Sequence, residues 1–88
     1  MDNKLFVASL SFKIRDAELT EIFASVGSVV SAKVILDRDG RSKGFGFVEM
    51  GSKEEADQAI LKLNGSSQFG REIVVNRQKA KESRPSYN

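Results

Sequence analysis

The chain has 88 residues, of which 30% are charged and 40% hydrophobic, and a formal net charge of +2 at pH 7. This length supports one domain with a single modest core. The sequence contains no cysteine and no histidine. This excludes disulfides and thiolate metal ligands and removes the commonest general base, so we expect a protein that is not an enzyme and holds no metal or cofactor.

The N-terminus lacks the basic segment and the long apolar stretch of a signal peptide, and no apolar run is long enough to cross a bilayer. We therefore expect a soluble, intracellular monomer that does not bind membranes. The cytoplasm is the first expectation for its location, with the nucleus and the organelles left open.

The first part of the chain predicts a strand and a helix. Residues 5–10 are rich in apolar side chains, which favours a short strand. Residues 16–26 carry apolar side chains at helical spacing. These are Leu19, Ile22, Phe23 and Val26. Asp16 can cap this helix or favour its N-terminal dipole, and Gly27 follows as a stop signal.

Two further strands are predicted on either side of a charged turn. Residues 29–36 are β-branched and apolar, as is typical of a strand, and residues 37–42 form a polar turn. Residues 43–50 read Lys-Gly-Phe-Gly-Phe-Val-Glu-Met and form the next strand.

The last part predicts a second helix and a final strand. The helix spans residues 52–64, and Ser52 with Glu55 forms a capping-box pattern at its start. Residues 71–77 form the strand. We expect the domain to comprise residues 1–80, followed by a polar, disordered tail over residues 81–88.

The element order is βαββαβ. This order predicts an α+β ferredoxin-like sandwich, in which a four-stranded antiparallel sheet carries two helices on one face. The other face of the sheet is then open to solvent.

The strand over residues 43–50 carries two phenylalanines on one side. Because strand side chains alternate, Phe45 and Phe47 share one face, while Val48 and Met50 take the opposite face and suit a core. Phenylalanines at this spacing more often belong to a core, but that register would bury the charges at the strand's ends and expose the apolar pair. We therefore predict that both rings lie on the open face, where a flat ligand would explain them.

The same alternation on the other strands completes a candidate binding surface of flat, cationic and amide side chains. Its members on or next to the strands are Phe6, Ile35, Phe45, Phe47, Lys4, Lys33, Lys43, Asn76 and Gln78, and Arg41 is added from the loop before residues 43–50. Aromatic groups interleaved with lysines and amides fit a single-stranded nucleic acid. A solvated charge is the plainer interpretation of Lys4 and Lys33, and Arg41 can equally belong to a solvated turn or to a phosphate clamp.

Three large apolar side chains are predicted to be structural. Leu36 suits the core face of its strand, while Phe12 and Phe69 are expected to fill loops under the sheet edges.

The charges are unevenly distributed along the chain. The two predicted helices hold six acidic and two basic residues, or −4, and the rest of the chain holds twelve basic and six acidic residues, or +6. We expect the sheet side to attract phosphate and the helical side to repel it.

The chain resembles the RNA recognition motif (RRM) family over about residues 3–80. Residues 43–50 match that family's eight-residue signature, basic-Gly-aromatic-Gly/Ala-Phe-Val-any-aromatic, except at Met50. Residues 5–10 resemble the six-residue signature, with Ser9 where Asn or Gly is usual. In size the chain is similar to small single-RRM proteins of bacteria and plant organelles.

The resemblance implies that Phe6 and Phe47 each stack a base, that Phe45 lies between sugars and that Lys43 pairs with a phosphate. We therefore predict non-catalytic binding of single-stranded RNA, with single-stranded DNA left open and no small-molecule substrate. The alternative is an RRM that binds peptides, typically through an Arg-any-Phe motif, although no arginine stands at that position before Phe69. An acylphosphatase-like enzyme would need a glycine-bearing anion loop, and residues 9–13 contain no glycine.

Overall fold

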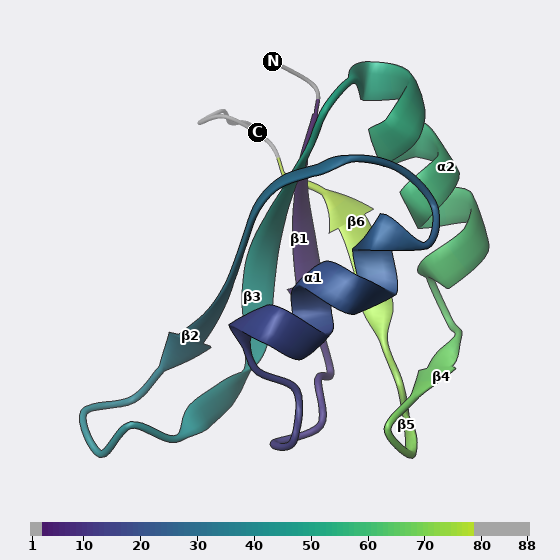
Figure 1. Ribbon diagram of the computed structural model, residues 1–88. Helices are drawn as coiled ribbons and strands as arrows, with labels where there is room; N and C mark the ends of the chain where they lie inside the picture. Colours follow the sequence, from purple (N-terminus) through teal and green to yellow (C-terminus); the bar gives the residue numbers. More distant parts are fainter. Residues whose placement is uncertain (1–2, 79–88) are drawn as a thin grey trace, which may run out of the picture.

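The computed structural model describes residues 3–78, which form a four-stranded sheet, two helices and a short hairpin (Figure 1). The elements are β1 (Lys4–Ala8), α1 (Asp16–Ala24), β2 (Val29–Leu36), β3 (Ser42–Met50), α2 (Lys53–Leu63), β4 (Ser67–Gln68), β5 (Arg71–Glu72) and β6 (Val74–Arg77). The predicted α+β ferredoxin-like fold is confirmed. The expected boundary at residue 80 and the expected tail over 81–88 lie outside the described residues.

The main sheet has the strand order β2-β3-β1-β6, and its neighbouring strands are antiparallel. The two segments with family-like sequences, β1 and β3, are therefore the central strands. Phe6 of β1 lies directly opposite Phe47 of β3 on one side and opposite Asn76 of β6 on the other. Lys33 of the edge strand β2 lies opposite Phe47.

The core lies on one side of this sheet only. Its buried members come from alternate strand positions and from both helices. They include Leu5, Val7, Val34, Val48, Met50 and Val75 of the strands, Leu19 and Phe23 of α1, and Ala56, Ala59 and Leu63 of α2. Strand residues alternate between the two faces of a sheet, so the buried strand residues share one face. Both helices pack against these residues and therefore cover the same face. We call the uncovered face, which carries Phe6, Phe45 and Phe47, the open face.

Helix α1 starts differently from the prediction. Arg15, not Asp16, is its N-cap residue, and the Glu18 carboxylate accepts the Arg15 N–H at 2.9 Å. The Asp16 carboxylate instead accepts the backbone N–H of Val34 at 2.8 Å. Asp16 therefore ties the start of α1 to β2, and its charge in the first turn still favours the helix dipole.

Helix α2 begins with one half of the predicted capping box, the bond to the Ser52 side chain, while the Glu55 carboxylate binds the backbone of another segment. The Ser52 hydroxyl accepts the Glu55 N–H at 3.2 Å, and the Glu55 carboxylate accepts the Ser28 N–H at 2.8 Å. The Ser28 N–H, followed by the Ser52 hydroxyl, lowers the pKa of Glu55 below its ordinary value of 4.5. An ion pair between Arg77 and Asp57 then joins β6 to α2.

The predicted final strand over residues 71–77 is split in two. Residues 71–72 pair with residues 67–68 in the β4–β5 hairpin. Ile73 donates its N–H to the Ser66 carbonyl at 2.9 Å, and its own carbonyl accepts the Gly65 N–H at 2.7 Å. Because these main-chain groups are used within the hairpin region, only residues 74–77 of the predicted last strand pair with β1.

Three predictions of structural roles are wrong. Leu36 is 43% exposed, because the pairing of β2 with β3 shifts between Val34 and Leu36 and breaks the alternation there. Phe12 is 72% and Phe69 52% exposed, so neither fills a loop under the sheet.

The backbone conformation at Ser9 explains why Asn or Gly is usual at this position of the six-residue signature. Ser9 has a φ of 62°, in the left-handed region that glycine and asparagine adopt more readily than other residues. This conformation ends β1 and starts the loop toward α1.

Candidate nucleic-acid interface

Three phenylalanine rings form one cluster on the open face. The ring centroids of Phe6 and Phe47 are 5.5 Å apart, those of Phe6 and Phe45 are 5.7 Å apart, and those of Phe45 and Phe47 are 6.4 Å apart. The ring planes are tilted by 56°, 40° and 87° respectively, within the range of favourable edge and tilted contacts. Each ring is partly exposed, so the cluster supports its members laterally and still presents ring surface to solvent.

The local sequence explains how β3 can carry these rings in the centre of the sheet. Gly46 faces the crowded side of β3, where a Cβ would overlap the carbonyl oxygen of Lys33 and lie 3.0 Å from the Cα of Val34. Gly44 has a φ of 86°, and its carbonyl accepts the Leu10 N–H at 2.8 Å. Gly46 between the two rings thus allows close approach of β2, and Gly44 before Phe45 allows close approach of the chain that leaves β1.

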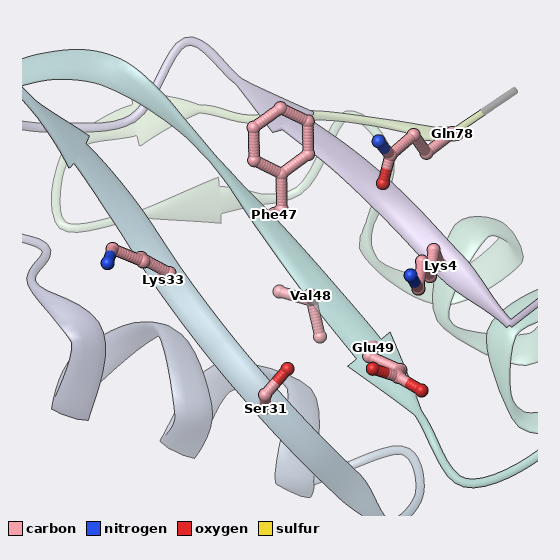
Figure 2. A pocket seen from close by; sticks show the side chains of 7 residues that line it. All are labelled: Lys4, Ser31, Lys33, Phe47, Val48, Glu49 and Gln78. Carbon is pink, nitrogen blue, oxygen red and sulfur yellow. The ribbon is translucent and has the colours of Figure 1, made fainter. Parts of the chain in front are cut away.

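A shallow hollow of about 180 Å³ adjoins Phe47, and residues from all four strands of the sheet or their ends contribute to it (Figure 2). It is lined by Lys4, Ser31, Lys33, Phe47, Val48, Glu49 and Gln78. Four of these residues, Lys4, Lys33, Phe47 and Gln78, were predicted as site residues. Gln78 is held beside β1 by donating its backbone N–H to the Lys4 carbonyl at 2.9 Å.

Ser31 and Glu49 line the same hollow and were not among the predicted site residues. Glu49 lies two residues after Phe47, and Ser31 lies two residues before Lys33. The two-residue period of the strands is therefore the signal that would have found both. Glu49 accepts a hydrogen bond from the Asn3 side-chain amide at 3.4 Å, so one carboxylate oxygen is held in place at the edge of the hollow.

The cations of the open face are exposed. Lys4, Lys33 and Lys43 all have exposed side chains. Within residues 3–78 none of the three forms an ion pair with a carboxylate. Their ammonium groups are thus available to an anion from solution.

The remaining predicted residues lie at different distances from the rings along the sheet. Asn76 is exposed on β6 opposite Phe6, so its amide is beside the ring cluster. Ile35 is partly exposed at the irregular end of β2. Arg41 is not part of the hollow beside Phe47, because it lies in the turn before β3 and lines a second hollow with Phe12.

In the part of the chain that the structure describes, no group of three or more His, Cys, Asp or Glu side chains is placed to hold a metal ion. Neither described helix has the length and apolar character needed to span a membrane.

Comparison with known proteins identifies the same combination of fold and sequence. The family model described as the RNA recognition motif matches residues 5–74. The chain is 45% identical over 82 residues to small RNA-binding protein 11, a chloroplast protein of Arabidopsis thaliana, and the match covers 92% of this chain and 56% of that protein. Other matched relatives are named as chloroplast ribonucleoproteins or as a mitochondrial glycine-rich RNA-binding protein.

Solved structures agree with this. The crystal structure of RNA-binding protein PG1 has a TM-score of 0.83 and 38% identity, and the match covers 90% of this chain and 96% of that one. A structure of the Sex-lethal protein in a complex with RNA has a TM-score of 0.80 and 35% identity, covering 85% of this chain and 47% of that one. The chain spans about half or less of the length of the curated relatives that it matches.

Proposed function

The chain belongs to the RNA recognition motif family, and on this basis we propose that it binds single-stranded RNA on the open face of its main sheet. The observation that carries this proposal is the cluster of Phe6, Phe45 and Phe47 on a face that no helix covers. Partly exposed aromatic rings are a suitable surface for unpaired bases, which are flat and can stack on them.

In this proposal the rings and the polar groups have different roles. Phe6 and Phe47 each stack one base, which contributes about 1–3 kcal/mol per base, and Phe45 packs between sugars. The amides of Asn76 and Gln78 bind base edges. About two to four nucleotides span the sheet, as expected for a platform of two or three stacked bases.

The charged groups supply the part of the affinity that depends on salt. Lys4, Lys33 and Lys43 contact phosphates, and each neutralised phosphate on a single strand contributes about −0.7 to the slope of log K against log salt concentration. Glu49 cannot serve in this way, because a carboxylate repels phosphate. Its acceptor oxygens suit the exocyclic amino group of a base, such as that of cytosine.

We propose a binding role without catalysis. Several matched relatives are named as chloroplast or mitochondrial proteins, which supports an organelle as the place of action in preference to the cytoplasm expected from the sequence. Imaging of the tagged protein in its source cells tests this location.

The proposal is tested by removing the two stacking rings together. We expect Phe6→Ala with Phe47→Ala to weaken binding to a random pool of single-stranded RNA by about 2 kcal/mol or more, the lower bound for two stacked bases. Fluorescence anisotropy measures this affinity. Since both rings lie outside the core, the double variant should keep its fold, which thermal unfolding followed by circular dichroism checks.

Leu61→Ala is a matched control. Leu61 is 76% exposed on α2, on the side of the molecule away from the open face, so its removal should leave RNA affinity unchanged. If the double phenylalanine variant binds the pool as tightly as the wild type, the open face is not the RNA-binding surface.

A further inference from the structure

Phe12 is the most exposed phenylalanine among residues 3–78, with 72% of its surface accessible. The loop between β1 and α1 holds it there through buried neighbours, because Leu10 is 1% and Ile14 0% exposed. The Ile14 N–H donates to the Ser11 carbonyl at 3.0 Å, and the Lys13 N–H donates to the Ser11 hydroxyl at 3.2 Å. Phe12 therefore sits at the tip of an anchored turn, where an apolar ring gains nothing from the core.

A hollow of about 490 Å³ lies against this ring, which is within the size range of small-ligand sites, about 300–1,000 Å³. It lies between the loop after β1 and the turn before β3. Its lining residues are Phe12, Arg15, Asp37, Arg41 and Ser42. The described part of the chain thus brings an exposed ring and two guanidinium groups to one hollow.

The charge of this hollow favours an anion. Arg15 and Arg41 have exposed side chains, and neither forms an ion pair with another residue that the structure describes. One oxygen of the Asp37 carboxylate is occupied, because it accepts the N–H groups of Asp39 and Arg41 at 2.8 and 3.0 Å. Asp37 thereby stabilises the turn that carries Arg41. With two arginines and one aspartate, the lining of the hollow has a net positive charge.

The hollow lies at the same end of the sheet as Phe45. Phe45 pairs with Ala8 at the last position of β1, and the next contact along the chain is the Leu10 N–H on the Gly44 carbonyl. Arg41 and Ser42 come immediately before this part of β3. A strand that crosses the open face and passes Phe45 therefore reaches the end of the sheet where Phe12 is presented.

We infer that Phe12, Arg15 and Arg41 form a second nucleotide site, which takes an unpaired nucleotide of the same strand beyond those on the open face. Phe12 stacks the base, and the two guanidinium groups bind the phosphates on either side. This inference rests on the proposed function of the open face. A protein partner is disfavoured, because four of the five lining residues are polar or charged and charged residues are depleted at the centre of protein interfaces.

The test compares RNA of two lengths. Random single-stranded RNA pools of four and of eight nucleotides are titrated against the wild type and Phe12→Ala by fluorescence anisotropy. We expect Phe12→Ala to lower the affinity for the longer pool by about fivefold or more, the lower end for one stacked base, and to affect the shorter pool much less. Phe12→Tyr, which keeps a stacking ring, should retain the affinity for the longer pool.

Phe69→Ala is the matched control, because Phe69 is the other strongly exposed phenylalanine and lies in the β4–β5 hairpin. It should leave both affinities unchanged. The second site is refuted if Phe12→Ala binds the longer pool as the wild type does, or if it weakens both pools equally. If the wild type binds neither pool, the proposed function of the open face fails and the second site fails with it.

Discussion

On the open face, stacking and charge are supplied by different side chains. The three rings contact one another, while Lys4, Lys33 and Lys43 are exposed around them and form no ion pairs within residues 3–78. The two contributions can therefore be removed separately. In the proposed function, the rings determine how strongly unpaired bases are held, and the lysines determine how strongly the affinity depends on salt.

Lys43 offers the clearest test of the charge contribution. We expect Lys43→Ala to make the slope of log K against log salt concentration shallower by about 0.7, the contribution of one phosphate contact, and to leave the preferred sequence unchanged. Titrations of one RNA at several salt concentrations measure the slope.

Lys62→Ala removes the same charge from α2, away from the open face, and should change the slope much less. An unchanged slope for Lys43→Ala together with a changed preferred sequence would contradict the assignment of Lys43 to phosphate.

At the scale of elements, the approach of β2 to β3 depends on one glycine between the two rings. A Cβ at Gly46 would overlap the Lys33 carbonyl oxygen, which belongs to the backbone and cannot move without shifting β2. The Gly-Phe-Gly-Phe pattern thus serves two needs, rings on one face and close strand packing on the other.

Gly46→Ala is accordingly expected to destabilise the fold by about 1–3 kcal/mol, as overpacking of a close contact does. Urea unfolding at a fixed temperature measures the change in the free energy of unfolding. Ser31→Ala, at an exposed position of β2, should be close to neutral. A stability of Gly46→Ala equal to that of the wild type would mean that β2 does not lie this close to β3.

The two-residue alternation of strand side chains predicted most of the strands and the faces of their residues, because the buried residues of β1 and β3 are regularly spaced. It failed at Leu36, where an irregular pairing of β2 with β3 breaks the period. It placed Ile73 in the core correctly, but it did not show that the backbone of residues 71–73 bonds to residues 65–68 and not to β1. The pattern of side chains does not show with which segment a backbone group forms its hydrogen bond.

The site was predicted less completely than the fold. The rings, lysines and amides follow from strand faces, but the exposure of Phe12 depends on how two loops approach each other. An apolar residue in a loop is expected to be buried, and only the three-dimensional arrangement shows that this ring is not.

At the scale of the whole molecule, the two faces of the sheet differ in two ways: helices pack on only one of them, and the charge on the two sides differs. The segments of α1 and α2 hold six acidic and two basic residues, while the rest of the chain holds twelve basic and six acidic residues. Both helices pack on the face opposite the rings. We therefore expect the long-range field to favour the approach of a polyanion from the sheet side over the helical side.

The central claim is that the open face, and not the helical side, is the RNA-binding surface. Mapping of backbone amide chemical shifts by NMR during titration with single-stranded RNA tests it most directly. We predict that the largest changes fall on β1 and β3 and on neighbouring positions such as Lys33 and Asn76, with small changes on α1 and α2. Changes concentrated on the exposed sides of the two helices, with β1 and β3 unaffected, would contradict the account.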